Sequence, residues 1–233
     1  MKIKPVLALA LFALGTASAR AAVIPGETSD SVIHYYDVEQ TSNATLISQY
    51  FNDFNNTVAV FAFQLPTLSA GQSFASASVS ISVSFPRYTP TGYDLYGDDA
   101  RASSAVTTQD WSSNPVSGTR PSAGVLLQKD LLSAANYTVG IKTADITSYL
   151  NTQYAGGTNA GEYVFLRVQP GAFGTSGTEV QFDSADSPNA AVRPVVNYTV
   201  ASSVVAPEAS SVLLIASGLL TIGGVALRRR RVA

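Results

Sequence analysis

The clearest pattern in the chain is a strict alternation of apolar residues and serines between positions 75 and 85. Side chains of a β-strand point to opposite faces in turn, so this alternation predicts a strand with one face in a core and one in water. The residues expected to face the core are Ala75, Ala77, Val79, Ile81, Val83 and Phe85. Residues 58–65 are apolar on both faces except at Gln64, which predicts a more central strand.

Other short segments favour strands as well, because they are rich in apolar residues and are bounded by Gly, Pro, Asn and Ser. They are residues 31–38, 93–96, 125–130, 137–141, 163–168, 179–183 and 195–200. Helical spacing occurs at 145–150, where Ile146, Tyr149 and Leu150 fall on one face and Asp145 can cap the first turn. The sequence therefore predicts an all-β domain, a β-sandwich or jelly roll, with one short helix.

The two ends of the chain differ from this pattern. Lys2 and Lys4 precede an apolar stretch at 5–14 and small residues at 17–19, which predicts a secretory signal peptide over 1–22. Residues 210–227 carry no charge and would be roughly 27 Å long as a helix, enough for a single transmembrane span. The arginines that follow favour the cytoplasmic side, so residues 23–203 are predicted to form one exported domain.

The C-terminal segment combines three parts in a fixed order. Pro207, Glu208 and Ala209 come first, then the uncharged span, and then an arginine cluster; its members are Arg228, Arg229, Arg230 and Arg231. This arrangement, over 204–233, resembles the PEP-CTERM sorting tail, although that family usually has Pro-Glu-Pro at the motif. The resemblance implies processing by an exosortase, a membrane-embedded cysteine transpeptidase-like enzyme of polysaccharide-producing Gram-negative bacteria. A permanent single-pass anchor is the alternative.

The charge of the exported domain excludes one class of partner. Of the 14 Lys and Arg residues, Lys2, Lys4, Arg20 and the four tail arginines lie outside it, whereas of the 16 Asp and Glu residues only Glu208 does. An acidic domain of this kind is expected to bind no nucleic acid, but it could bind cations. The chain has no cysteine, which excludes disulfides, cysteine nucleophiles and thiolate zinc sites.

Few residues offer chemistry. His34 is the only histidine and lies in a strand-like run, so a structural role is favoured over a catalytic one. Asp98 and Asp99 follow a short predicted strand, in what is expected to be a turn. Calcium needs six to eight oxygen ligands, of which two adjacent aspartates supply a part, so the alternatives are a solvated turn and a structural calcium site. No other cofactor is expected.

Four aromatic residues lie in or beside predicted loops and could stack on sugar rings. They are Tyr88, Tyr93, Tyr96 and Trp111. The alternative for each is a place in the core, where aromatic rings bury large areas, and Trp111 is the first candidate for burial.

Pieces of the exported domain also resemble the DNRLRE-type jelly-roll domains of bacterial surface and polysaccharide-associated proteins. They are residues 58–65, 76–81, 144–150, 180–184 and 193–198, and they occur in the expected order. Residues 110–115, around Trp111, only partly match the family's tryptophan, asparagine and proline cluster. The resemblance implies a structural, adhesive or carbohydrate-binding module without catalytic activity.

Together these features predict a non-enzymatic protein with a structural or adhesive role at the cell surface or in the extracellular polysaccharide matrix of a biofilm. A specific carbohydrate-binding module is the alternative. A glycan hydrolase is a third and less favoured hypothesis, because the chain has few residues that could act as acid or base. The expected partners are signal peptidase and the general secretion machinery, an exosortase-type enzyme, the membrane before processing, and extracellular polysaccharide. The precursor is expected to be anchored in the inner membrane.

Overall fold

The computed structural model describes residues 21–34, 37–39, 44–50, 56–86, 92–107, 110, 124–171 and 178–202. The chain divides into two units, Met1–Ser202 and Ser203–Ala233, and every described residue belongs to the first. Residues 1–20 of the predicted signal peptide and the whole predicted sorting tail lie outside the described ranges. Within those ranges, no helix has the length and apolar character needed to cross a bilayer.

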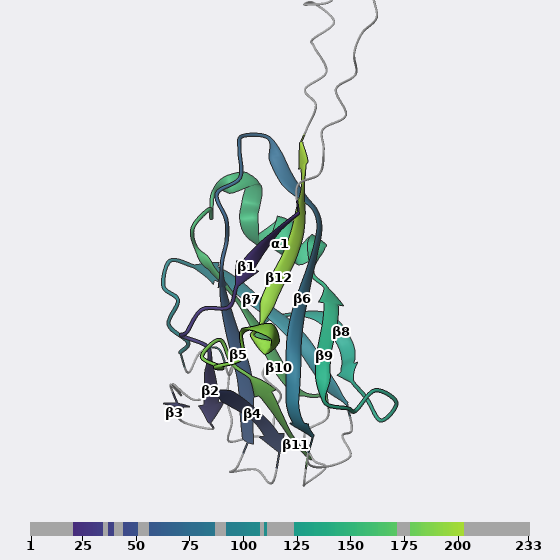
Figure 1. Ribbon diagram of the computed structural model, residues 1–233. Coiled ribbons are helices and arrows are strands. Elements are labelled where there is room, and N and C mark those ends of the chain that lie inside the picture. The colour runs from purple at the N-terminus through teal and green to yellow at the C-terminus, as the bar shows by residue number, and fades with distance from the viewer. Residues whose placement is uncertain are drawn as a thin grey trace, which may run out of the picture. The chain divides into compact units, whose positions relative to one another are not determined.

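The first unit is built mainly from β-strands, as the sequence predicts (Figure 1). The strands are β1 (Ala21–Pro25), β2 (Ser31–His34), β3 (Asp37–Glu39), β4 (Thr45–Tyr50), β5 (Asn56–Gln64), β6 (Gln72–Pro86), β7 (Tyr93–Arg101), β8 (Val125–Leu132), β9 (Gly140–Asp145), β10 (Tyr163–Pro170), β11 (Thr178–Asp183) and β12 (Val195–Ser202). The helix α1 (Thr147–Tyr154) follows β9, and two 3₁₀ turns lie at Ala155–Gly157 and Ala190–Val192.

The strands form one curled antiparallel sheet. Its main path runs β1-β12-β6-β11-β4-β5-β10-β7-β8, while β9 pairs with the opposite edge of β6 and the β2–β3 pair is attached to β5. The strand β8, at one end of the path, and the strand β9 lie near each other on one side of the molecule (Figure 1), while β1 stands at the other end of the path. The prediction of an all-β domain with one short helix is confirmed.

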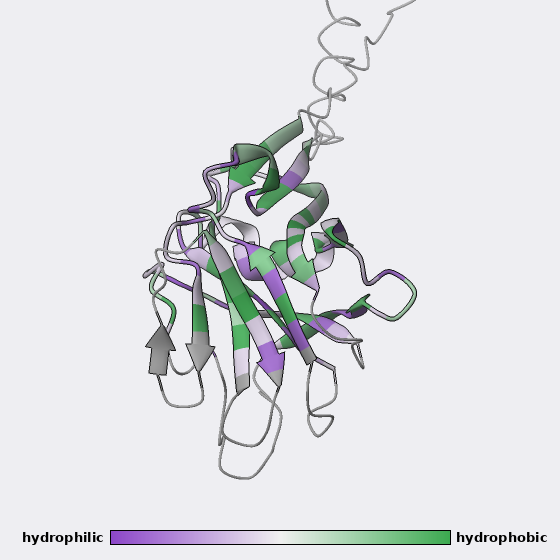
Figure 2. Ribbon diagram, turned by 60° about the horizontal axis from the view of Figure 1, so that its bottom comes forward, coloured by the Kyte–Doolittle hydropathy of each residue, from purple (hydrophilic) through white to green (hydrophobic). Residues whose placement is uncertain are grey.

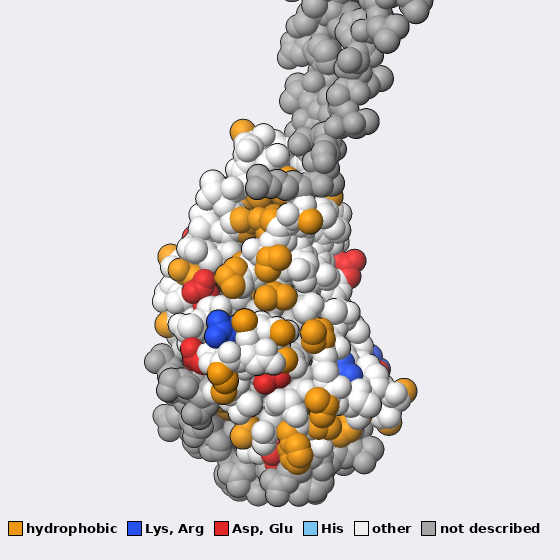
Figure 3. All heavy atoms as spheres, viewed as in Figure 1, with side chains coloured by type: hydrophobic (Ala, Val, Ile, Leu, Met, Phe, Trp, Pro, Cys, Tyr) orange, Lys and Arg blue, Asp and Glu red, His pale blue; other side chains and the backbone are white. Residues whose placement is uncertain are grey.

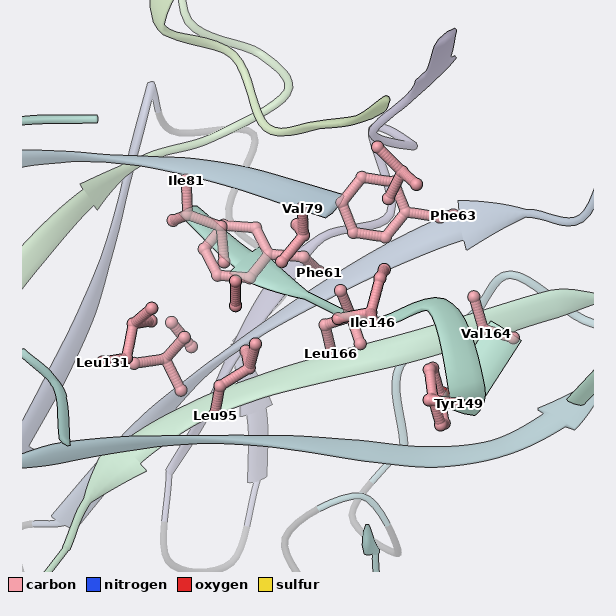
Figure 4. Close-up of a cluster of buried hydrophobic side chains, with 14 of the residues drawn as sticks. Phe61, Phe63, Val79, Ile81, Leu95, Leu131, Ile146, Tyr149, Val164 and Leu166 are labelled. Atoms are coloured by element: carbon pink, nitrogen blue, oxygen red, sulfur yellow. The ribbon is translucent and has the colours of Figure 1, made fainter. Parts of the chain in front are cut away.

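Side chains from both sides of the curl fill its interior. In Figure 2 the strands carry both apolar and polar residues along their length. Because successive side chains of a strand point to opposite faces, the apolar ones can gather on the face that lies in the core. Figure 4 labels ten core residues from five strands and from the helix α1 with the residue before it: Phe61, Phe63, Val79, Ile81, Leu95, Leu131, Ile146, Tyr149, Val164 and Leu166. The other face of β5 is covered too, since Val58, Val60 and Ala62 are buried in a second cluster with Phe165. This confirms that β5 is a central strand.

The predicted alternation in β6 is correct in the middle of the strand and wrong at both ends. Ala77 and the three apolar residues after it are buried, but Ala75 is exposed and Phe85 is 49% exposed. The pairing register shifts once near each end of β6, between Ser76 and Phe74 opposite β12 and between Phe85 and Val83 opposite β11. One extra residue in a strand moves every side chain beyond it to the other face, so Phe74 enters the core instead of Ala75.

The helix α1 begins two residues later than predicted and extends further. Asp145 Oδ1 accepts a hydrogen bond of 2.8 Å from Thr147 N, which lowers the pKa of this exposed carboxyl group and stabilises the first turn. Ile146, Tyr149 and Leu150 are buried on one side, as their spacing predicts. The helix packs over one end of the curled sheet, between β6 and β7.

Several predicted boundaries need correction. Residues 31–38 form two short antiparallel strands rather than one, with His34 opposite Asp37. The predicted strand 137–141 is instead β9, because Asn136 Oδ1 accepts hydrogen bonds from Ser133 N and Oγ and fixes a turn just before it. The strands β1 and β4 were not predicted, since neither has a sustained alternation of apolar and polar residues.

Candidate functional site

Asp98 and Asp99, the predicted calcium ligands, lie within a strand rather than in a turn. The strand β7 continues to Arg101, five residues beyond its predicted end. Asp98 is buried and pairs with Arg167, whereas Asp99 is exposed and accepts a hydrogen bond of 3.3 Å from Gln153 Nε2. Among the residues that the structure describes, no group of three or more His, Cys, Asp or Glu side chains could hold a metal. Calcium binding by this pair remains a prediction, but the turn on which it was based is wrong.

The partner of Asp98 is the most deeply buried charge among the described residues. Arg167, on β10, has a relative exposure of 0%. Its Nη1 donates to both oxygens of Asp98 at 3.2 Å and to the backbone carbonyl oxygen of Asp110 at 2.5 Å, and its Nε donates to Gln169 Oε1 at 2.9 Å. The ring of Tyr96 lies under the same guanidinium group, with its centroid 5.5 Å from Cζ.

A second arginine extends this network toward the connection between β7 and β8. Arg101 donates to both carboxylate oxygens of Asp110, at 2.5 and 2.6 Å, and to the carbonyl oxygen of Ala105 at 2.7 Å. Its guanidinium carbon lies 3.5 Å from the ring centroid of Phe165. Asp110 is therefore held by Arg101 through its side chain and by Arg167 through its backbone, which ties the chain after β7 to the outer face of the sheet.

Burial dominates the electrostatics of this network. It raises the pKa of Asp98 to about 7, although the charge of Arg167 opposes the change, and it lowers the pKa of Arg167 itself. Burial also raises the pKa of Tyr149, whose hydroxyl donates to the carbonyl oxygen of Asp98 at 2.5 Å. We interpret the cluster as a brace for the fold. Its signal in the sequence is a single arginine inside the otherwise apolar segment 163–168.

The aromatic candidates do not form a common platform. Tyr93 is fully buried and its hydroxyl donates to Ser48 O at 3.2 Å, so its place is in the core and the sugar-stacking hypothesis for it is wrong. Tyr96 is half-buried against Arg167. Tyr88 and Trp111 lie outside the described residues. His34 lies in β2, as expected, with its backbone opposite Thr57.

A hollow of about 420 Å³ lies between the start of β8 and the helix α1. Its apolar side is formed by Val125 and Leu126, which are 56% and 47% exposed, and its polar side includes Thr147, Ser148 and Gln153. The titratable residues of its lining are Asp145 and Tyr149. Among the described contacts, these two residues do not form an acid–base pair with each other.

A shallower hollow, of about 250 Å³, lies on the outer face of β1, β12 and β6. Residues directly opposite each other in an antiparallel sheet point to the same side, and the register places Ser76 opposite Thr199 and Ser78 opposite Asn197. Six residues of β6, β9 and β12 on this side are partly or fully exposed, and we call them the hydroxyl face: Ser76, Ser78, Ser80, Thr143, Asn197 and Thr199.

The six residues of the hydroxyl face are uncharged; Asp145 on β9, opposite Ser78, adds one exposed carboxylate at its edge, and the face has an apolar margin. Ser76 Oγ and Thr199 Oγ1 are 2.7 Å apart and share a hydrogen bond. The margin is formed by Val23 on β1 and Ile141 on β9, each 56% exposed. Figure 3, which views this side, shows few charged side chains over β1, β12 and the neighbouring part of β6. Hydroxyl groups both donate and accept, so such a surface suits a neutral polyhydroxylated ligand better than an ion.

No protein-family model matches the chain, and no curated protein matches it significantly.

Proposed function

We propose that this chain is an exported β-domain that a C-terminal sorting tail delivers to the cell surface or to the extracellular polysaccharide matrix, where it has a structural or adhesive role. The observation that carries the proposal is the order of parts in the tail: Pro207-Glu208-Ala209, the uncharged span 210–227 and the cluster Arg228–Arg231. The predicted signal peptide at the other end agrees with it, because a sorting tail acts on a chain that has entered the secretory route.

We further propose that the curled sheet is a jelly-roll β-sandwich of the DNRLRE type. In support, neighbouring strands on the main path are mostly distant in sequence, as in β12-β6-β11-β4 and β5-β10-β7, and short loops alone cannot produce that order. The core between β6 on one side and β5, β10 and β7 on the other also agrees with two packed layers.

The sorting proposal is tested in the producing bacterium by following the C-terminus of the protein. Mass spectrometry should find the natural chain cut close to Pro207-Glu208-Ala209, and deletion of the gene should reduce the cohesion of the matrix. A variant with Arg228–Arg231 replaced by glutamine should accumulate as an uncut precursor, whereas the control Val232→Ala should be processed normally. Uncut natural chain would contradict sorting, and normal cohesion after deletion would contradict the structural role.

The hydroxyl face favours a second candidate function, binding of a neutral polysaccharide. Its Ser, Thr and Asn groups can exchange hydrogen bonds with sugar hydroxyls, while Val23 offers apolar contact to the C–H side of a ring. In affinity electrophoresis through the bacterium's own polysaccharide, the full chain in detergent should be retarded. Ser78→Lys should abolish the retardation, whereas Thr158→Lys, an exposed control in the turn after α1, should not. Equal mobility with and without polysaccharide would refute this function.

A further inference from the structure

Asp30 is the most deeply buried carboxyl group in the described part of the chain, with a relative exposure of 1%. It lies at the end of the turn between β1 and β2, and its backbone N–H donates to Glu27 O at 3.1 Å. One carboxylate oxygen, Oδ2, accepts a hydrogen bond of 2.6 Å from Ala185 N. The other oxygen, Oδ1, is buried and has no hydrogen-bond partner among the residues that the structure describes. A buried carboxylate oxygen without a partner is unfavourable, so something other than this chain is expected to meet it.

The surroundings of Asp30 supply further oxygen atoms and a second negative charge. Asp186, from the loop after β11, is close enough for its charge to raise the pKa of Asp30. The hydroxyl of Ser29 is also buried and lacks a partner in the protein. Two segments far apart in the sequence therefore meet at Asp30: the β1–β2 turn with Ser29, and the loop in which Ala185 N donates a hydrogen bond to Asp30 and is followed by Asp186.

The close approach of these two segments is built into the fold. Gly26 N donates to Pro194 O at 2.9 Å, and a Cβ atom on Gly26 would lie 2.8 Å from Cγ of Pro194 and 3.5 Å from Cβ of Ala185. Glycine at this position lets the β1–β2 turn lie against the loop after β11. The nearest arginine in that loop, Arg193, uses its Nε to donate to Ser187 O at 2.7 Å.

The chemistry of the oxygen set identifies the missing partner. Carboxylate, hydroxyl and carbonyl oxygens are hard ligands; the chain has no cysteine, and the described side chains found to act on Asp30 include no imidazole. Calcium accepts six to eight oxygens in an adaptable geometry that includes backbone carbonyls and water, so two carboxylates are enough to begin a site. We propose that Asp30 and Asp186 bind a calcium ion, with Ser29 beside it, and that the ion clamps the β1–β2 turn to the loop after β11.

The proposal is tested by thermal unfolding of the full chain in detergent, with calcium varied from about 10⁻⁵ to 10⁻² M, which spans the affinities of extracellular calcium modules. Calcium should raise the Tm, a chelator should reverse the shift, and magnesium at the same concentration should give a smaller one. Asp30→Asn should abolish the shift. Asp130→Asn removes an exposed carboxylate on β8 and serves as the matched control, which should keep the shift. Asp99→Asn is measured as well, because Asp99 is a calcium ligand predicted from the sequence.

Asp30→Asn removes a buried group and can fail to fold, so a second variant is measured by calorimetric titration with calcium. Asp186→Asn changes a half-buried side chain and should bind calcium at least tenfold more weakly than the natural chain. An unchanged Tm of the natural chain across the whole calcium range would overturn the proposal, because a proton alone would then neutralise Asp30. A calcium shift lost in Asp99→Asn but kept in Asp186→Asn would overturn it as well. Neither outcome bears on sorting of the tail.

Discussion

Replacing Arg167 with methionine is the sharpest test of the buried network. The change keeps a long side chain but removes the positive charge beside Asp98 and the donors to the Asp110 carbonyl and the Gln169 side chain. Removing one partner of a buried ion pair costs about 3–5 kcal/mol, because the other charge stays buried without compensation. Because the free energy of unfolding of a small domain is about 5–15 kcal/mol, Arg167→Met should remove a large part of the stability of the protein.

The cost should depend on pH, which separates a charge effect from a packing effect. Without Arg167 the pKa of Asp98 should rise above its present value of about 7, so the carboxyl group can escape part of the penalty by taking up a proton. Urea unfolding followed by circular dichroism should therefore give a larger loss at pH 8 than at pH 5. The double variant Arg167→Met, Asp98→Asn should recover part of the loss at pH 8. A loss below about 1 kcal/mol at both pH values would refute the interpretation of the network as a brace.

Three further outcomes are expected. When a chelator removes calcium, burial raises the pKa of Asp30 from 3.8 to about 7. Its contribution to stability is therefore complete below pH 3.8 and is lost as the pH rises through 7. Asp30→Asn should make the urea midpoint of unfolding less dependent on pH between about pH 4 and 8. Gly97→Ala should cost about 1–3 kcal/mol in the same assay, because its Cβ would overlap the ring of Tyr149; an unchanged midpoint would mean that the ring can move away. Phe74→Ala should cost about 3–5 kcal/mol, whereas Phe85→Ala should cost little; equal losses would contradict the register shifts in β6.

The sequence was informative wherever one period persisted over many residues. The long alternation around Val79 and the apolar run around Phe61 both gave correct strands, since burial of one or both faces leaves a direct pattern. The bulges could not be predicted, because an extra residue in a Ser/Ala-rich strand changes no local preference; only the pairing with β12 and β11 reveals it. The division of residues 31–38 into two strands was missed for a related reason, because aromatic and apolar residues continue through this segment of the sequence.

The candidate sites were harder to predict than the fold. Adjacent aspartates at 98 and 99 suggested a shared site, yet one is buried by a partner that lies 69 residues away in sequence and the other is exposed. Asp30 carried no signal at all, because its burial depends on a loop at the far end of the chain, 155 residues away at Ala185. Contacts of this kind depend on topology, and a single sequence does not encode them in any local pattern.

The position of β12 between β1 and β6 determines when the fold can be completed. The strand β1 pairs with β12, with Ala21 opposite Thr199. The first described strand to be synthesised therefore cannot form this pairing until the last one has been made. At about 5–20 residues per second, that wait lasts on the order of ten seconds or more. During this time β1 and the free edge of β6 are open to other strands, including those of neighbouring molecules. The chain is thus most exposed to misassembly while it is being made, and its folding is governed by its final strand.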